Sequence, residues 1–478
     1  MFILYIALAI IAALVGVIIV RTLTFTPKAG AAVSDEAITF DGNTMIVNLR
    51  QLIRCKTVSY ADKTKEDDAE FKKLRDLLPT LYPTVFRKCE VNDLPDRALL
   101  IKWEGKKAGD PAVFMAHYDV VPVDEKRWDK PPFEAILENG VVWGRGSLDT
   151  KITMNGILFA AEHLMRRGFE PEHDIYFAFS GNEETNGAGA KNIVDLFEEN
   201  GITPSIVLDE GGAVVENVFP GVKAPCAVVG IAEKGLMNIE YKVKSAGGHA
   251  SAPAPHTPVG VLSRACCRIE NKPFKRHLTK PAAEMFDTLG RHSNFLYKMI
   301  FANLWCFSGL LDLICKASGG EINALMRTTV AFTQMTGSSA PNVIPPEARM
   351  VSNIRLNPED TVDSAREYIE KVIGDKNVEL TILNGDNPSR VSRTDCPEWN
   401  KLGLAIASTW KGSIVTPYLM VQCSDSRHWG RISDKVYRFS AMDLTKEERA
   451  TIHGNNERIR IDCAKRTAEF YIRMLKQF

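Results

Sequence analysis

Two short segments of the sequence carry residue types that bind divalent cations. Met115-Ala-His117-Tyr-Asp119 and Gly181-Asn-Glu183-Glu184 each follow an apolar run that is typical of a buried strand. Imidazole and carboxylate are the usual zinc ligands where no thiolate is used. The sequence therefore predicts that a pair of divalent cations binds at strand ends.

His117 and Asp119 are two residues apart, so on a strand they would share one face. Asp119 could then accept a hydrogen bond from the second ring nitrogen of His117, which would fix the tautomer and raise the basicity of this ligand. An ordinary histidine in a loop after a strand is the alternative.

Glu183 and Glu184 are adjacent carboxylates, which repel each other unless cations lie close. With metal present the two can have different roles: Glu184 would bind metal, and Glu183 would act as general base toward water. A solvated acidic turn before a helix is the alternative, because the helix dipole favours acidic residues there.

Other candidates are less specific. Asp149 follows Gly144-Arg-Gly-Ser-Leu, where glycines permit close backbone approach, and it could bridge two metals. Asp209 and Glu210 supply a further carboxylate, and the sequence does not decide which of the two reaches the metal. His453 lies in Ile-His-Gly-Asn-Asn-Glu457, where nothing local identifies it as a ligand.

Two groups have the chemistry of substrate contacts. His249, in Gly247-Gly-His-Ala-Ser, could donate to an oxyanion. Arg427, in Ser424-Asp-Ser-Arg, could bind a carboxylate with two parallel hydrogen bonds. A structural ion pair or a cap is the competing interpretation for each.

The elements that must position these groups follow an α/β pattern. Between residues 38 and 236, short apolar strands alternate with amphipathic helices, which predicts a mainly parallel sheet. Functional groups in such sheets gather at the carboxyl ends of strands. The predicted strands begin at Ala98, Ala112, Asp174 and Ser205, and the predicted helices span 152–167, 190–200, 401–410 and 461–476.

The pattern changes near Leu236, where alternation predicts an antiparallel strand and a smaller α+β domain over residues 237–387. Within it, residues 280–319 predict a helical insertion rather than a membrane span, because Lys298 and Asp312 interrupt the apolar run. The α/β pattern resumes over residues 388–478, so the smaller domain would interrupt the larger one.

Residues 1–21 predict a transmembrane anchor, because the first 20 hold no charge and about 20 apolar residues cross a bilayer. A cleaved signal peptide is the alternative, with Ala29-Gly30-Ala31 as a small-residue cleavage site. Arg21 and Lys28 follow the segment, which weakly favours a body on the cytoplasmic side.

Composition excludes some other classes. The chain has 478 residues and a net charge of zero, which argues against nucleic-acid binding. Its ten cysteines form no Cys-x-x-Cys pair, and most lie in apolar runs, so we expect buried free thiols such as Cys306 and Cys315.

Taken in order, these motifs resemble the dinuclear zinc family of aminoacylase-1, carnosinase and carboxypeptidase S. They are His117-x-Asp119, Gly-Arg-Gly-x-x-Asp149, Glu183-Glu184, Asp209-Glu210-Gly, Gly-His249-Ala-Ser, Asn342-Val-Ile-Pro, Asp-x-Arg427 and His453-x-x-Asn-Glu. The likeness is greatest to the branch of carboxypeptidase S and the N-fatty-acyl-amino-acid hydrolases, which share the N-terminal apolar segment and the lengthened insertion.

The resemblance implies two zinc ions per subunit. His117, Asp149 and Asp209 would hold one zinc, and Asp149, Glu184 and His453 the other. Glu183 would be the general base and Asp119 would orient His117. The middle domain would be a lid that commonly forms homodimers. The implied substrate contacts are His249, which could come from the partner subunit, Asn342 and Arg427.

The predicted function is zinc-dependent cleavage of an amide bond next to a free carboxylate, in a peptide or an N-acyl amino acid. Two alternatives are an aminopeptidase on the same core and a non-catalytic ligand-binding relative. An aminopeptidase would need a carboxylate for the substrate amine in place of Arg427. A non-catalytic relative would typically lose the base or a metal ligand, and this chain keeps all of them.

Overall fold

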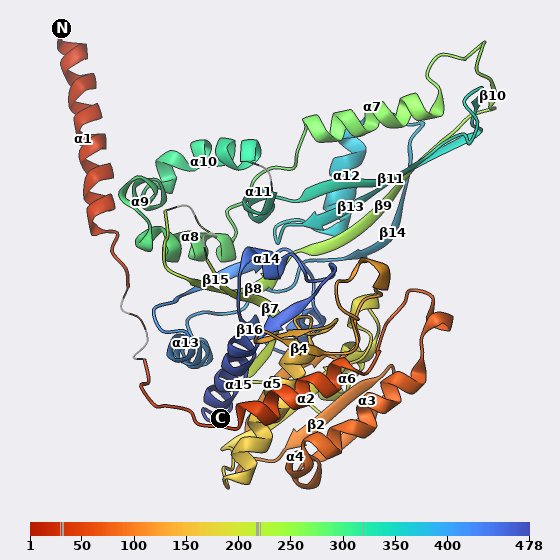
Figure 1. The fold of residues 1–478 in the computed structure, drawn as a ribbon. Helices are drawn as coiled ribbons and strands as arrows, with labels where there is room; N and C mark the ends of the chain where they lie inside the picture. Colours follow the sequence, from red (N-terminus) through yellow and green to blue (C-terminus); the bar gives the residue numbers. More distant parts are fainter. Residues whose placement is uncertain (29, 31–32, 217–218, 220, 319) are drawn as a thin grey trace.

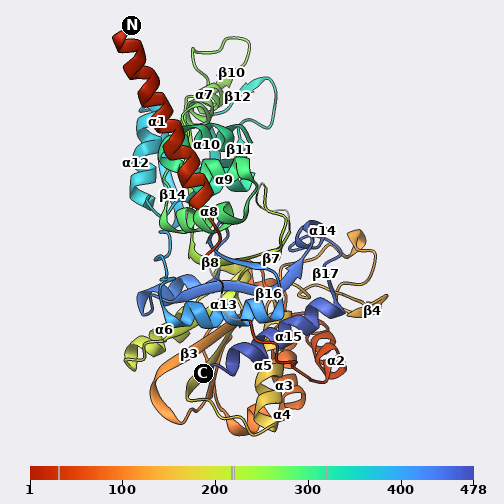
Figure 2. The ribbon, with the colours of Figure 1, turned by 90° about the vertical axis from the view of Figure 1, so that its left-hand side faces the viewer.

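The computed structural model describes residues 1–28, 30, 33–216, 219, 221–318 and 320–478. A larger α/β part carries a smaller α+β part on one side, and a long helix extends from the N-terminal end (Figures 1 and 2).

The larger part is built on an eight-stranded sheet whose centre is parallel. Strands β3, β6 and β7 run parallel, as do β7 with β16 and β8 with β15, whereas β1, β2 and the β16–β8 contact are antiparallel. The sheet is therefore mixed and mainly parallel, as predicted. In spatial order the strands are β1 (Glu90–Leu94), β2 (Ala98–Trp103), β6 (His173–Ser180), β3 (Lys107–His117), β7 (Ile206–Val215), β16 (Val436–Leu444), β8 (Cys226–Glu233) and β15 (Ile414–Met420).

Helices cover both faces of this sheet, as expected for buried parallel strands. Helix α5 (Lys151–Arg166) is buried along almost its whole length between the sheet, α2 (Gly42–Ile53) and α15 (Ile461–Leu475). On the other face α6 (Gly189–Glu199) packs with the 3₁₀ segment η4 (Asp425–Arg431). Further helices of this part are α3 (Asp68–Leu81), α4 (Pro83–Lys88), α13 (Pro397–Thr409) and α14 (Lys446–Arg449).

The smaller part is an antiparallel sheet with a core of its own. Its strand order is β11 (Thr329–Thr336), β13 (Glu347–Leu356), β9 (Gly235–Lys244) and β14 (Glu379–Asp386). Buried side chains alternate along β9 and β13, and helices α7 (Pro258–Asn271) and α12 (Val362–Ile373) cover the buried face. At its tip, β10 (Gly248–His249) pairs with β12 (Val343–Ile344).

The insertion is helical, as predicted, but it packs with the larger part. It comprises α8 (Lys280–His292), α9 (Phe295–Ala302), α10 (Leu304–Ser318) and α11 (Gly320–Met326). Met285, Phe286 and Leu289 of α8 join the core that surrounds the large sheet, and α8 lies against β15. The packing therefore groups the insertion with the large sheet, although it lies inside the range 237–387.

Helix α1 (Phe2–Thr24) is the only helix of the described residues that is long and apolar enough by itself to cross a membrane; its mean hydropathy is 3.1. The alternative cleavage site at Ala29-Gly30-Ala31 includes residues outside the described ones. All ten cysteines are free, and Cys315 is buried as predicted. Cys306 is exposed, so the prediction of a buried thiol was wrong there.

A small sheet ties the C-terminal segment to the loop that carries Asp149. Strand β5 (Val141–Trp143) pairs with β4 (Ile136–Glu138) and β17 (Arg458–Arg460). Next to β17, the buried Glu457 carboxylate accepts hydrogen bonds from Arg145 and from the backbone N–H groups of Gly146, Leu148 and Asp149. One side chain thus fixes the whole loop between β5 and α5.

Replacing Glu457 with Ala should destabilise the fold strongly. The change leaves the Arg145 guanidinium buried without its carboxylate, and breaking a buried pair costs about 3–5 kcal/mol. Denaturant unfolding followed by tryptophan fluorescence measures the effect. As a matched control, Asp35→Ala removes the exposed pair with Lys411 and should leave stability nearly unchanged. Equal stability of the two variants would contradict the role given to Glu457.

Candidate metal centre and active site

His117 ends β3 at the carboxyl edge of the sheet, and Asp119 holds its ring. The Nδ1 atom of His117 lies 3.3 Å from Asp119 Oδ1. The same buried carboxylate accepts the backbone N–H groups of Glu183 and Glu184 at 3.2 and 3.1 Å. Asp119 therefore positions both the first imidazole and the acidic turn after β6.

Asp149 lies between the two histidines that the sequence singles out. Its Oδ1 is 2.9 Å from His117 Nε2, and its Oδ2 is 3.0 Å from His453 Nε2. His453 Nε2 is also 3.0 Å from Glu184 Oε2. Residues separated by more than 300 positions along the chain thus meet at one carboxylate, whose two oxygens face different imidazoles.

The structure separates the roles of Asp209 and Glu210. Both lie within β7, not after it, and neighbouring side chains on a strand point to opposite faces. Glu210 Oε1 lies 3.2 Å from His117 Nε2. The Asp209 carboxylate instead accepts the backbone N–H of Ser426 at 3.0 Å. Glu210, which the sequence left as an alternative, is the member that faces the cluster.

Two groups of potential ligand atoms result, each within a span of 4.8 Å. One contains His117, Asp149 and Glu184, and the other contains His117, Glu183 and Glu210. The buried Glu184 Oε1 has no hydrogen-bond partner in the described part of the chain. A carboxylate oxygen buried without a donor is costly, and a cation would satisfy it.

The crowding of carboxylates shifts the proton equilibria of the whole cluster. Burial raises the pKa of Glu210 to about 8, and burial with nearby carboxylates raises that of Glu183 well above its usual range. Hydrogen bonds to Asp149 and Glu184 raise the pKa of His453 to about 10. Although burial alone would lower it, Glu210, Asp119 and Asp149 raise the pKa of His117. The negative charge of the clustered carboxylates therefore attracts cations or protons.

Arg427 projects from η4 on the other side of this turn. Its Nη1 donates to Asn186 Oδ1 at 3.0 Å, and the side chain is half-buried. Burial and the neighbouring Asp209 raise the pKa of Asp425, two residues before it, to about 7, against the effect of a hydrogen bond from Ser180. Arg427 thus presents a cation beside the acidic turn.

His249 and Asn342 lie close to each other but away from the metal centre. The backbone N–H of Ala250 donates to the Asn342 carbonyl at 3.0 Å, and both residues are exposed at the tip of the smaller part. Figures 1 and 2 show β10 at the end of this part that is remote from β7, and Figure 2 shows that β3 is remote from it as well. Within one chain, the structure does not bring these two predicted substrate contacts to the cluster.

A cavity of about 790 Å³ opens next to the cluster. Asp149, Glu183, Glu210 and His453 form its polar end. Beyond them the lining is mostly apolar, and its hydrophobic members include Ala213, Val215, Val228, Met420, Val421, Met442, Leu444 and Ile452. Arg355, which the sequence did not single out, also lines this cavity, and its Nη1 lies 3.2 Å from Cys423 Sγ.

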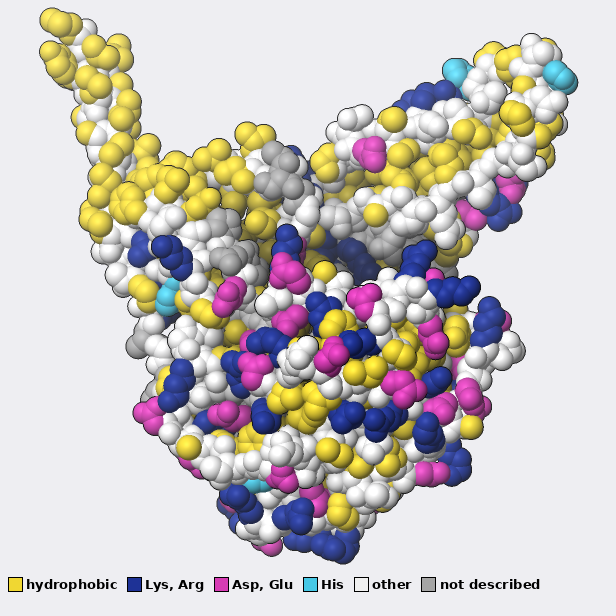
Figure 3. All heavy atoms as spheres, viewed as in Figure 1, with side chains coloured by type: hydrophobic (Ala, Val, Ile, Leu, Met, Phe, Trp, Pro, Cys, Tyr) yellow, Lys and Arg dark blue, Asp and Glu magenta, His cyan; other side chains and the backbone are white. Residues whose placement is uncertain are grey.

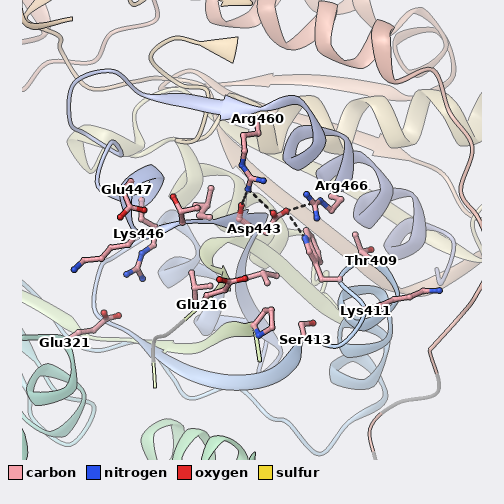
Figure 4. Close-up of a pocket in the computed structure, with 17 residues that line it drawn as sticks. Glu216, Glu321, Thr409, Lys411, Ser413, Asp443, Lys446, Glu447, Arg460 and Arg466 are labelled. Atoms are coloured by element: carbon pink, nitrogen blue, oxygen red, sulfur yellow. Dashed lines mark hydrogen bonds and ion pairs between the residues drawn. The ribbon is translucent and has the colours of Figure 1, made fainter. Parts of the chain in front are cut away.

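A second cavity of about 850 Å³ borders the first but lacks its chemistry (Figure 4). Its central charges are engaged in ion pairs: Arg460 and Arg466 both pair with Asp443, at 2.9 and 3.1 Å. Trp410 Nε1 donates to the same carboxylate at 3.0 Å. No histidine is among its lining residues in the described ranges, so the candidate metal centre lies at the first cavity.

Sequence reasoning missed two further positioning groups. Glu457 was noted only as the end of the His453 motif, and Arg145 only as a member of a glycine-rich turn. The signal that could have found them is a pair of opposite charges in two segments that carry predicted ligands. Arg145 lies in the segment of Asp149, and Glu457 lies in the segment of His453. The orientation of β7 at Glu210 has no such signal, because it depends on how the sheet is built.

Comparison with known proteins agrees with this geometry. A family model described as peptidase family M20/M25/M40 matches residues 113–477. Probable carboxypeptidase S-like 2 of Dictyostelium discoideum is 32% identical over 480 residues, covering 97% of this chain and 92% of that protein. The N-fatty-acyl-amino acid synthase/hydrolase of Xenopus tropicalis is 32% identical over 474 residues, with the same coverage of 97% and 92%.

Solved structures share the fold. An M20 family metallo-carboxypeptidase from Sulfolobus solfataricus superposes with a TM-score of 0.67 at 19% identity, covering 90% of this chain and 98% of that chain. Human carnosine dipeptidase 1 gives 0.62 at 15% identity, covering 91% and 97%. The resemblance inferred from the motifs is confirmed, and the chain belongs to peptidase family M20/M25/M40, a family of metal-dependent hydrolases.

Proposed function

We propose that this protein is a dinuclear zinc hydrolase that cleaves an amide bond next to a free carboxylate. The observation that carries the proposal is Asp149, whose two oxygens face two different imidazoles at 2.9 and 3.0 Å. That arrangement suits a carboxylate shared by two cations. Imidazole and carboxylate donors without thiolate fit zinc.

The proposed ligand sets differ from those of the resemblance at one position. His117, Asp149 and Glu210 would hold one zinc, and Asp149, Glu184 and His453 the other. Glu210 replaces Asp209 because the Asp209 carboxylate is engaged by the Ser426 backbone. Zinc binds neutral imidazole, so the protons that the carboxylates retain on His117 and His453 would leave as the metal binds.

Glu183 is the proposed general base. Its side chain lines the cavity beside Glu210, and its backbone is held by Asp119. When bound, zinc would polarise the scissile carbonyl and favour ionisation of the attacking water. Glu183 would take the proton of that water and pass it to the leaving nitrogen. Its raised pKa in the metal-free protein suits a group that must hold a proton transiently.

The cavity favours an N-acyl amino acid with an apolar acyl chain. Beyond the polar end its lining is mostly apolar, which would accommodate hydrocarbon better than a polar peptide backbone. Arg355, which lines the cavity, and Arg427, which lies outside its lining beside the acidic turn, would attract the free carboxylate of the amino-acid part. One relative is named as an N-fatty-acyl-amino acid synthase/hydrolase, and a second candidate function, carboxypeptidase, rests on the name of the other. An aminopeptidase is disfavoured by these arginines.

We further propose that α1 anchors the protein in a membrane. Its length, its apolar composition and its exposure in the structure support an anchor, with a signal sequence as the alternative. The residues Arg21 and Lys28 favour a body on the cytoplasmic side only weakly. The smaller part, the expected lid, remains the expected site of a homodimer contact. In such a dimer, His249 could reach the active site of the partner subunit.

Glu183→Gln should keep the metal and lose turnover. The substitution removes the proton acceptor without removing a proposed ligand, and general base catalysis contributes roughly 10²–10⁴-fold. Hydrolysis of an N-acyl amino acid and elemental analysis measure the two effects. Glu447→Gln, at the rim of the second cavity, is the matched control and should behave as the wild type. Near-normal turnover of the Glu183 variant would remove the base assignment.

Glu210→Gln and Asp209→Asn separate the two carboxylates of β7. We expect Glu210→Gln to lower the zinc content from two ions toward one per chain, because the neutral amide is a poor zinc ligand. Asp209→Asn keeps an oxygen for the Ser426 N–H and should hold both ions. Elemental analysis after dialysis decides the matter, and the opposite pattern would restore Asp209 as the ligand.

Arg427→Lys should weaken selection of free-carboxylate substrates. The substitution keeps the charge but loses the planar fork. Since a hydrogen bond to a charged group is worth roughly 1.5–3 kcal/mol, kcat/KM should fall on the order of 10–100-fold. Amidated analogues should change little. Arg431→Lys, on the same segment but paired with Asp195 at the surface, is the control. If the wild type cleaves amidated and free substrates equally well, Arg427 does not select a carboxylate.

A further inference from the structure

Helices α9 and α10 of the insertion expose a continuous set of large apolar side chains. Each of these side chains is between 44% and 64% exposed, which is unusual for residues of this type: Phe295, Leu296, Trp305, Leu310, Leu313 and Ile314. On α10 the spacing of Leu310, Leu313 and Ile314 places these three side chains on one helix face, and Trp305 lies at the start of the same helix. Contiguous exposed apolar surface in a folded protein marks a contact with something outside the chain.

The two charged residues of α10, Asp312 and Lys316, pair with each other beside this face. Asp312 turns toward the body, where it pairs with the buried Arg327. Lys316 pairs with the same carboxylate at 3.1 Å. The face that holds Leu310, Leu313 and Ile314 therefore contains no charged side chain, and the ion pair of Lys316 with Asp312 lies at its border.

The same surface is joined to the end of α1. Arg21 Nε donates to the Ala302 carbonyl at 3.1 Å, and Asn303 Nδ2 donates to the Ile18 carbonyl at 3.3 Å. Thr22 is buried at this junction. Figure 3 shows hydrophobic side chains running from α1 onto the insertion helices at its foot. The apolar stripe is thus continuous with the proposed membrane anchor.

We propose that the exposed faces of α9 and α10 lie in the interfacial layer of the lipid bilayer that α1 spans. This inference rests on the proposed anchoring by α1. Neither helix can span by itself, because 8 and 15 residues rise only about 12 and 22 Å against a core of about 30 Å. The two helices are bent by 114° against each other, which suits helices lying along a surface.

This membrane contact would serve the active site directly. Helix α11 follows α10, and its residues Gly320, Glu321 and Ala324 line the catalytic cavity. An acyl chain dissolved in the bilayer would therefore meet the apolar cavity near the membrane surface. A lipid surface, and not a second copy of the chain, is the favoured occupant because the stripe joins a helix that is itself suited to lipid.

The cysteines of the chain allow a direct test. Cys306 lies on α10 and Cys267 on α7, and these are the two exposed cysteines, the other eight being buried or half-buried. In the full-length, zinc-loaded chain with Cys267→Ser, a fluorescent maleimide would label Cys306. The matched control carries Cys267→Ser, Cys306→Ser and Val47→Cys, which places the label on α2, remote from α1 in Figures 1 and 2. The double Ser variant gives the background.

Both labelled proteins are reconstituted in phosphatidylcholine vesicles and recovered by flotation. We expect lipids brominated in the upper acyl chain to quench the Cys306 label several-fold more strongly than the label at position 47. Aqueous iodide should show the reverse order. A chain that floats but has a Cys306 label as open to iodide as the control overturns the membrane contact alone.

Two other outcomes also decide against the proposal. A Cys306 label that neither quencher reaches means that protein, such as a second copy, covers α10. A chain that does not float overturns the proposed anchor itself, and with it this inference. Hydrolysis of a short-chain, soluble N-acyl amino acid by the same preparations shows whether the proposed catalytic function holds independently.

Discussion

The concentration of carboxylates around two imidazoles is the constraint that the rest of the structure serves. Asp149, Glu183, Glu184 and Glu210 meet at the edge of the cavity, where their side chains are largely buried and their charges repel each other. Such a cluster is stable only if cations or protons neutralise it. The surrounding protein must therefore hold the ligands in place without supplying the compensating charge itself. It does so with Asp119, Glu457 and Arg145, which fix the turns and leave the centre open to metal.

Much of this arrangement could be predicted from the sequence. Strands β2, β3 and β6 are short apolar runs with clear ends, and these runs alone predict that His117 and the Glu183–Glu184 turn lie at strand ends. Helices α5 and α15 follow from apolar spacing along long segments. The antiparallel β9 follows from its alternation. These elements follow from the spacing of apolar residues within one segment, and this spacing can be read directly from the sequence.

The remainder depends on how elements meet. Asp209 and Glu210 are adjacent, so which of them faces His117 is decided by the orientation of β7 in the sheet, and no neighbouring residue reports it. The insertion is predicted as part of the smaller domain because it lies there in the chain, yet α8 packs on β15. Cys306 lies in an apolar run, and such a run does not say whether it faces protein or something else. The distance of His249 from the cluster depends on the separation of the two parts.

The route of the chain through the large sheet sets the order in which this protein can be completed during synthesis. Strand β16 lies between β7 and β8, and Glu457 organises the Asp149 loop from 308 residues further along. Until the last part of the chain has left the ribosome, the sheet lacks its interior strand β16. The Asp149 loop also lacks the Glu457 carboxylate that fixes it. The nascent protein thus contains the acidic residues of the cluster early, without the geometry that brings them together with His453. Assembly of the proposed metal site would thereby be coupled to the end of translation, because a chain that stops before β16 and Glu457 would lack the elements that complete it.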